Sequence, residues 1–256
     1  MFVGIDIGSR AAKGIALSGN KMLCSTLFDT GANPAKTGQR VLEELLTQSG
    51  KSESDIKYIV GTGYGRVSIP FADSTLTELS CHAAGAHFLN EDIRTVIDIG
   101  GQDSKVICLD DEGNMLDFIM NDKCAAGTGR FMEVAAKALE IDLNRLSATA
   151  GKADCPCEVT SMCAVFAESE VISLLASGQK PSNIAAGLHG AFARRVGAMA
   201  KRVGVKKQVA FVGGVAKNKD LERLICEYLD ITFVPLSVDP QMIGALGAAV
   251  VAQRSV

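Results

Sequence analysis

The chain has 256 residues, a formal net charge of −3 and a pI of about 5.7, and 47% of its residues are apolar against 21% charged. This balance is typical of a folded protein with a sizeable core, and the lack of a basic run argues against nucleic acid as a partner. No apolar stretch approaches the ~20 residues that cross a bilayer, and the start MFVGIDIGS lacks the basic region of a signal peptide. We therefore expect a cytoplasmic protein with neither nucleic acid nor a membrane as partner.

Eight cysteines are present, and a reducing compartment does not favour a disulfide framework. Each cysteine is therefore predicted to be either a small core residue or a chemically active group. Four lie in apolar strand-like or helical runs and are predicted to be structural: Cys24, Cys81 (followed by His82), Cys108 and Cys226. With three histidines and no C-x-x-C pair, a zinc ribbon or a thioredoxin motif is disfavoured.

An internal repeat organises the chain. IDIGSRAAKGIAL (5–17) and IDIGGQDSKVICL (97–109) share Ile, Asp, Ile, Gly, Lys, Ile and Leu at a constant offset of 92 residues. Each copy predicts an apolar strand, a glycine turn and a second apolar strand, which together make a β-hairpin. The repeat therefore predicts two similar lobes.

Strands and helices alternate along the chain. The pattern predicts strands over 56–63, 208–218 and 231–235 in addition to the hairpins. It predicts helices over 35–50, 75–89, 163–178, 184–204, 219–229 and 241–253, and a further helix with an apolar face from Phe131 to Leu139. This alternation indicates the α/β class.

Three glycine turns follow apolar strands: Gly8-Ser9, Gly100-Gly101-Gln102 and Gly213-Gly214. Such turns present several backbone N–H groups together, which is the arrangement that binds phosphate. Asp6 and Asp98 come just before the two hairpin turns, where a carboxylate either holds a Mg²⁺-bound water or caps the turn; we favour the Mg²⁺ role. No GxxxxGK[ST] sequence occurs, which excludes a P-loop nucleoside triphosphatase.

The segments DIGSRAAK, DIGGQDSK, FVGGVAKN and MIGALGAA resemble, in this order, the two phosphate motifs, the adenosine motif and the connecting motif of the actin–hexokinase–chaperone ATPase superfamily. The resemblance implies two ribonuclease-H-like lobes, 1–92 and 93–240, with ATP in the cleft and a final helix, 241–256, that returns to the first lobe. It implies that Gly8, Ser9, Gly100, Gly101 and Gln102 contact phosphates, and that Gly213, Gly214 and Asn218 border the adenosine. Asp6 and Asp98 would position Mg²⁺, Lys13 and Lys105 would balance phosphate charge, and Gln102 would orient the attacking water.

Within that superfamily, NDKCAAGTGRF (121–131), TSMCAVFAESEV (160–171), GTGYGR and ELSCHAAGA resemble the activator ATPases of 2-hydroxyacyl-CoA dehydratases; the ATP-binding subunits of benzoyl-CoA reductases are similar. The resemblance implies a homodimer with one four-iron, four-sulfur cluster held by Cys124 and Cys163 of each subunit. It implies an ATP-dependent one-electron reductase, which receives electrons from ferredoxin or flavodoxin. The acceptor would be a 2-hydroxyacyl-CoA dehydratase or a related iron–sulfur reductase.

The residues around the two cysteines agree with a cluster. Both cysteines are predicted at helix starts, Cys124 before Gly127 and Gly129 and Cys163 after the capping pair Thr160-Ser161, and a helix start lowers a thiol pKa. Gly127 and Gly129 are further predicted to lie on the phosphate side of the nucleotide site and to sense it.

Three alternatives remain open from the sequence. The segment DCPCE (154–158) is either an exposed loop or a source of an additional metal ligand, Cys155 or Cys157. The chain could also be a small-molecule kinase, acting on a sugar or an acyl group, on the same two lobes. It could finally be an actin-like scaffold, which would need a self-complementary surface.

Overall fold

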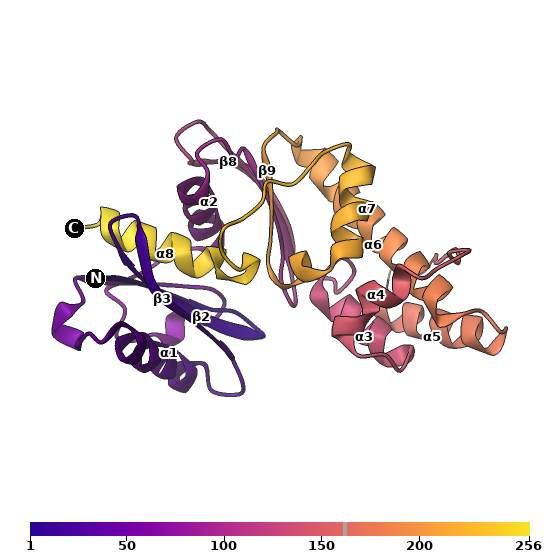
Figure 1. Cartoon of the computed structure of the whole chain (residues 1–256), viewed down its shortest axis with the longest axis horizontal. Coiled ribbons are helices and arrows are strands. Elements are labelled where there is room, and N and C mark those ends of the chain that lie inside the picture. Colours follow the sequence, from indigo (N-terminus) through magenta and orange to yellow (C-terminus); the bar gives the residue numbers. More distant parts are fainter. Residues whose placement is uncertain (161–162) are drawn as a thin grey trace. The chain divides into compact units, whose positions relative to one another are not determined.

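The computed structural model describes residues 1–160 and 163–256, and the chain divides into two compact units. Unit 1 comprises Met1–Val96, Leu109–Leu116 and Pro235–Val256, and unit 2 comprises Ile97–Cys108 and Asp117–Val234. In Figure 1 the C-terminal helix α8 is drawn in the same unit as the N-terminus. The boundaries predicted at residues 92 and 240 stay predictions.

Unit 1 is built on a five-stranded sheet with the strand order β3-β2-β1-β4-β5. The strands are β1 (Phe2–Ile7), β2 (Ala11–Ser18), β3 (Lys21–Asp29), β4 (Tyr58–Thr62) and β5 (Ser74–Thr75). Strands β1, β2 and β3 are antiparallel neighbours, whereas β4 pairs parallel with β1 and β5 parallel with β4. The hairpin predicted over 5–17 is confirmed, and its register places Asp6 opposite Lys13.

Three helices complete unit 1: α1 (Pro34–Ser49), α2 (Glu78–Leu89) and α8 (Ile243–Arg254), with short 3₁₀ turns at Glu53–Asp55, Arg66–Ser68 and Pro240–Met242. Because side chains alternate along a strand, Val3, Ile5 and Ile7 all point toward the core formed with α1. Gly4 lies on the opposite face, where an added Cβ would collide with the carbonyl oxygen of Ala245 in α8. Glycine at this position therefore lets α8 pack directly on the sheet, beside α2 (Figure 1).

Unit 2 contains the turn of the second hairpin and most of the helices. The second sheet has the order β8-β7-β6-β9, formed by β6 (Thr95–Ile99), β7 (Ser104–Leu109), β8 (Met115–Asn121) and β9 (Val209–Val212). This order matches β3-β2-β1-β4 of the first sheet, with β6 in the place of β1 and β9 in the place of β4. The repeat in the sequence is therefore a repeat of the fold.

The helices of unit 2 gather around one long helix (Figure 1). They are α3 (Gly129–Ala138), α4 (Leu146–Ala150), α5 (Ala164–Ala176), α6 (Pro181–Val203) and α7 (Lys219–Leu229), with 3₁₀ turns at Leu143–Arg145 and Gly214–Lys217. Helix α6 packs against α4, α5 and α7, and α3 packs against α5. The rings of Phe131 in α3 and Phe192 in α6 lie 6.2 Å apart in the core that joins them.

The predicted helices are confirmed with small shifts at their ends. Helix α1 ends at Gly50, which adopts φ 64° as a left-handed cap, and α7 has the predicted bounds. One strand prediction is wrong, and another is too long. ITFVP (231–235) forms only an isolated bridge between Phe233 and Val209, and the strand predicted over 208–218 ends at Val212, where Gly213 turns the chain. Strands β3 and β8 were not predicted, because their mixed, partly exposed side chains carry no clear period.

Candidate functional site

In unit 1, the first predicted phosphate turn joins β1 to β2. The Gly8 N–H donates to the carbonyl oxygen of Ala11 at 3.0 Å and closes the turn, and Ser9 is half-exposed at its tip. Asp6 is 3% exposed, and its carboxylate lies 2.8 Å from the Lys13 ammonium. The predicted Mg²⁺ residue and the predicted counter-charge are therefore an ion pair, which makes burial of the carboxylate tolerable.

Unit 2 repeats this arrangement. The Gly100 N–H donates to the carbonyl oxygen of Asp103 at 3.0 Å, and the Lys105 ammonium lies 3.2 Å from Asp98 and 2.7 Å from Asp103. All three charged side chains are buried, whereas Gln102 is exposed at the turn. The sequence analysis missed Asp103, because the first copy of the repeat has Ala11 at that position.

A positive-φ glycine lies against each of the two aspartates. Gly63 follows β4 with φ 89°, and an added Cβ would come within 2.5 Å of Asp6 Oδ1. Gly213 follows β9 with φ 86°, and an added Cβ would come within 2.5 Å of Asp98 Oδ1. Each predicted Mg²⁺ aspartate thus has, on one side, a glycine that directly follows the neighbouring strand and leaves room for the carboxylate. Gly214, the next residue after Gly213, begins a 3₁₀ turn and is exposed.

The loop that carries Cys124 is bonded to the predicted phosphate turn of unit 2. Asn121 Nδ2 donates to the carbonyl oxygens of Cys124 at 2.8 Å and of Ala126 at 2.9 Å, which fixes the start of the loop. At its end, the Gly129 and Arg130 N–H groups donate to the carbonyl oxygens of Gly100 (2.9 Å) and Gly101 (2.8 Å). The segment from Cys124 to the start of α3 is therefore a short physical link between an exposed thiol and the predicted phosphate turn.

Glycine is required at positions 127 and 129 for two different local reasons. Gly127 is buried with φ 81°, a conformation that side chains rarely adopt. Gly129 lies over the turn, where an added Cβ would be 3.1 Å from the Gly100 carbonyl oxygen and 3.3 Å from Gly101 Cα. Both glycines are thus needed for the loop to lie on the turn, and their contact with phosphate stays a prediction.

The second predicted ligand, Cys163, is exposed and is the N-cap residue of α5. The prediction that Cys124 also lies at a helix start is wrong, because four residues lie between it and Gly129, the first residue of α3. The capping role predicted for Thr160 is also wrong: its N–H and hydroxyl both donate to Glu170 Oε1. Ser161, the other predicted capping residue, lies outside the described residues.

Exposed apolar side chains lie near both cysteines in the chain. Val165, Phe166 and Ile172 of α5, which follows Cys163, are 69%, 66% and 56% exposed. Phe118 and Met120 point to the same face of β8, the strand that leads to Cys124, and are also exposed. Exposed apolar side chains of this size are candidates for contact with another protein.

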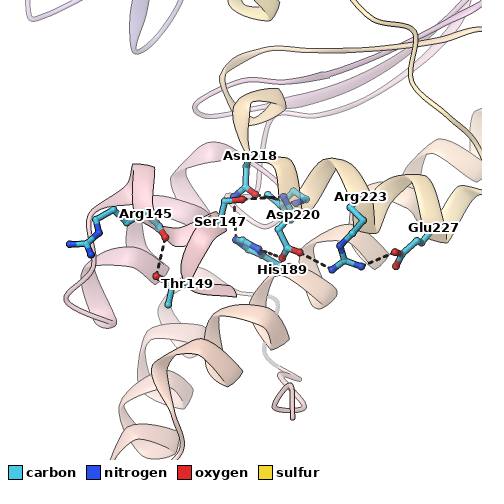
Figure 2. Close-up of polar contacts among 9 residues, drawn as sticks. Arg145, Ser147, Thr149, His189, Asn218, Asp220, Arg223 and Glu227 are labelled. Carbon is cyan, nitrogen blue, oxygen red and sulfur yellow. Dashed lines mark hydrogen bonds and ion pairs between the residues drawn. The ribbon is translucent and has the colours of Figure 1, made fainter. Parts of the chain in front are cut away.

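Asn218, predicted to border the adenosine, is held by a buried histidine that the sequence analysis did not select (Figure 2). His189 is 0% exposed; its Nδ1 lies 2.7 Å from Asp220 Oδ2 and its Nε2 lies 3.2 Å from Asn218 Nδ2. Because an amide nitrogen only donates, Nε2 accepts and Nδ1–H donates to the carboxylate. Asn218 Oδ1 in turn accepts the Leu221 N–H at 3.1 Å and caps α7, so the amide is fixed from both ends.

The chain was compared with known proteins. The model of the BadF/BadG/BcrA/BcrD ATPase family matches residues 3–252. The chain belongs to this ATPase family.

Two curated relatives agree with the assignment to the BadF/BadG/BcrA/BcrD ATPase family. The 2-hydroxyisocaproyl-CoA dehydratase activator of Clostridioides difficile is 45% identical over 252 residues, which cover 98% of this chain and 94% of that protein. The (R)-2-hydroxyglutaryl-CoA dehydratase activating ATPase of Acidaminococcus fermentans is 42% identical over 254 residues, covering 98% and 96%. Family membership was predicted from the cysteine motifs and is confirmed.

A solved structure of a relative confirms the predicted actin-like ATPase fold. The activator of the 2-hydroxyisocaproyl-CoA dehydratase from Clostridium difficile with bound ADPNP has a TM-score of 0.91 and 44% identity, and the match covers 100% of this chain and 98% of that one. Relatives of this kind are named activators and ATPases, which disfavours the alternative of a sugar or acyl kinase. No helix within residues 1–160 and 163–256 has the length and apolar character that a membrane span requires.

A four-iron, four-sulfur cluster needs four thiolate ligands, so the number and exposure of the cysteines decide whether this chain can hold one. Among the described residues, no group of three or more His, Cys, Asp and Glu could hold a metal ion. Cys124 and Cys163, the predicted ligands, are exposed and unbridged in unit 2, as is Cys155, so the predicted ligands of two copies of the chain amount to four. The donor set fits a cluster shared by two chains. By contrast, Cys81 is fully buried, and burial raises its pKa to about 12, as expected of a structural thiol.

Replacing Asp220 with Asn is expected to make the free energy of unfolding of this ATPase fall less steeply as the pH is lowered. Burial alone would raise the pKa of the Asp220 carboxyl, but hydrogen bonds from His189 and Arg223 outweigh it and hold the pKa below its usual value (Figure 2). Because the pKa is lower in the folded state, this stabilisation is complete above about pH 4 and is lost as the pH falls through the folded pKa. Urea unfolding from about pH 6 to about pH 3 measures the effect.

Arg223→Met is the matched variant for this experiment. It keeps the carboxylate and its His189 bond, but removes the Arg223 bond to Asp220 Oδ1 at 2.7 Å. Its pH dependence should therefore lie between those of the wild type and Asp220→Asn. If Asp220→Asn lost stability in acid as steeply as the wild type, the pH dependence would come from other groups.

Proposed function

We propose that this chain is an ATP-dependent activator that passes single electrons to a 2-hydroxyacyl-CoA dehydratase or a related iron–sulfur reductase. Family membership and the names of relatives up to 45% identical support the proposal. The main structural support is the hydrogen-bonded segment that joins Cys124 to the predicted phosphate turn at Gly100. Such a link matters because the redox group of an ATP-driven electron carrier must respond to the nucleotide. Ferredoxin or flavodoxin is the proposed electron donor, in the cytoplasm.

Two copies of the chain would hold one four-iron, four-sulfur cluster through Cys124 and Cys163 of each. When bound, such a cluster supplies transfer of one electron at a time. Phe166 and Ile172 of α5, which begins after Cys163, and Phe118 and Met120 of β8, which ends before Cys124, are exposed, and their burial against a second copy would stabilise a dimer.

ATP would bind with its phosphates on the glycine turns of the two units. The Gly8 and Gly100 turns present backbone N–H groups, and Asp6 and Asp98 would hold Mg²⁺ through its bound waters. A shift of the Gly100–Gly101 turn would move the start of α3, because the Gly129 and Arg130 N–H groups are bonded to it. The same displacement would reach Cys124 through the four residues that separate it from Gly129.

The test is anaerobic purification of the full chain, with iron, sulfide and activation of a 2-hydroxyacyl-CoA dehydratase measured. We expect about four irons per two chains. Cys124→Ser and Cys163→Ser should each lose the iron and the ability to activate the dehydratase in the presence of ATP and a reduced donor. Cys155→Ser tests whether the 154–158 loop adds a ligand, and it is expected to keep the iron.

Two results would contradict the proposal. Wild-type protein prepared without oxygen that contains no iron, although it binds ATP, would remove the cluster from Cys124 and Cys163. Transfer of phosphate from ATP to members of a sugar panel by the same preparation would favour the kinase alternative instead.

A further inference from the structure

A second pair of cysteines lies in a loop that α6 holds in place. Asn183 Oδ1 accepts the N–H groups of Asp154 at 3.1 Å and Cys155 at 3.3 Å, and Asn183 Nδ2 donates to Asp154 Oδ1 at 3.0 Å. The Cys157 N–H donates to the Asn183 carbonyl oxygen at 2.9 Å, and Lys180 forms an ion pair with Asp154. The Cys155-Pro156-Cys157 segment is therefore a fixed structure, which the expectation of a simple exposed loop did not include.

The two thiols differ in exposure. Cys155 is exposed, whereas Cys157 is half-buried with its Sγ 3.5 Å from Gln179 Oε1. Burial and the neighbouring Cys155 raise the pKa of the Cys157 thiol. Their Cα atoms can be at most about 7 Å apart, close to the ~4.4–6.8 Å that disulfides span, so a bridge needs only a small local change.

A cavity of about 510 Å³ adjoins this loop. Cys157 and Glu158 line one side, Gly187 and Arg194 of α6 another, and Asp220 and Arg223 of α7 a third. Gly187 allows the close approach, because an added Cβ would collide with the Cys157 carbonyl oxygen. The volume suits a ligand of the size of two linked amino acids.

The charged side chains that line this cavity differ in whether they form ion pairs. Arg223 already forms two ion pairs, with Asp220 Oδ1 at 2.7 Å and with Glu227 Oε1 at 2.7 Å (Figure 2). Arg194 and Glu158 form no ion pair with any of the described residues. Among the described residues, the cavity lining thus includes one exposed cation and one exposed anion without an ion-pair partner, together with the Cys157 thiol, and this set is complementary to a zwitterion that carries sulfur.

We infer that Cys155 and Cys157 form a thiol–disulfide exchange site whose ligand is a small zwitterionic disulfide of the amino-acid type. Arg194 binds a carboxylate of the ligand and Glu158 binds an ammonium group, which brings the disulfide to the loop. The inference is independent of the proposed electron-transfer function, since neither Cys124 nor Cys163 takes part.

The exchange proceeds in two balanced steps. The Cys155 thiolate attacks one sulfur of the ligand, the ligand S–S bond breaks, and half of the ligand leaves as a thiol with the proton that Cys155 gave up. The Cys157 thiolate then attacks Cys155 Sγ in the mixed disulfide and releases the second half in the same way. Two protein thiols are oxidised to one disulfide, and one ligand disulfide is reduced to two thiols.

The experiment uses reduced, full-length protein and cystine as the probe, with bis(2-hydroxyethyl) disulfide as an uncharged comparison. Peptide mapping after rapid alkylation should find a Cys155–Cys157 disulfide that forms about tenfold faster with cystine than with the uncharged disulfide. Arg194→Gln should remove this preference by slowing only the reaction with cystine. Arg202→Gln, an exposed arginine on the same helix outside the cavity, should keep the preference.

A trapping variant tests the order of the steps. Cys157→Ser should stop at one cysteinyl group on Cys155, whereas Cys155→Ser should not form the bridge. Equal rates with the two disulfides in the wild type, or an unchanged preference in Arg194→Gln, would overturn the cavity as the binding site. Absence of any Cys155–Cys157 bridge after exposure to cystine would overturn the exchange site itself, whether or not the protein contains iron.

Discussion

Gly213→Ala is expected to lower the free energy of unfolding by at least about 3 kcal/mol more than Gly178→Ala does. Both glycines have a positive φ, 86° and 84°, and Gly213 combines it with ψ 177°, an extended conformation that is almost confined to glycine. An alanine is therefore strained at either position, by about 1–3 kcal/mol. Gly178 has no atom within 4 Å of an added Cβ, whereas at Gly213 the Cβ would collide with the Ile99 carbonyl oxygen and lie 2.5 Å from Asp98 Oδ1.

Urea unfolding of the two variants measures the difference, which comes from the collision at Gly213 and from its extended positive-φ conformation. Gly213→Ala should also weaken ATP binding, since it displaces Asp98 and the end of β6, whereas Gly178→Ala should bind ATP like the wild type. Equal stability of the two variants would mean that β9 can move away from β6 at no cost. In that case the contact between Gly213 and Asp98 would not define the site.

Much of this site could be predicted because its residues obey local rules that repeat along the chain. The turn at Gly8 and the turn at Gly100 each follow a buried strand, and both carry the same Asp and Lys at the same offsets. The pairing of β1 with β2 follows from the same repeat. The predicted α/β class and the two-lobed ATPase fold were therefore confirmed, and the residues of each turn lie where the repeat places them.

What the sequence did not reveal depends on contacts between distant segments. His189 lies in the middle of a small-residue helix, and only its bonds to Asn218 and Asp220 show that it supports a predicted site residue. Asp103 looks like an ordinary turn residue until Lys105 is found 2.7 Å away. The docking of the Gly129 and Arg130 N–H groups on the Gly100 turn has no signature in either segment alone.

Lys105→Met is expected to destabilise the chain by about 3–5 kcal/mol, the usual cost of removing one partner from a buried ion pair. Lys105 is 2% exposed, and it is the cation between Asp98 and Asp103, which are 3% and 5% exposed. Methionine fills a similar volume, so the change removes the charge rather than the packing. Two carboxylates would then be buried together without the ammonium group that both now contact. Lys219→Met, which removes an exposed pair with Glu222, should change stability by less than about 0.5 kcal/mol.

The double variant Lys105→Met/Asp103→Asn separates charge from shape. If repulsion between the two carboxylates causes the loss, removing one negative charge should make the double variant more stable than Lys105→Met alone, although it carries an additional substitution. Asp103→Asn by itself keeps the Lys105–Asp98 pair and should cost less than Lys105→Met. A double variant less stable than Lys105→Met would assign the loss to packing or to hydrogen bonds of the Asp103 side chain. The wild type, the two single variants and the double variant can also be compared for ATP hydrolysis. This comparison would show whether the Lys105 charge also acts on the nucleotide, as its position at the start of β7, directly after the Gly100 turn, predicts.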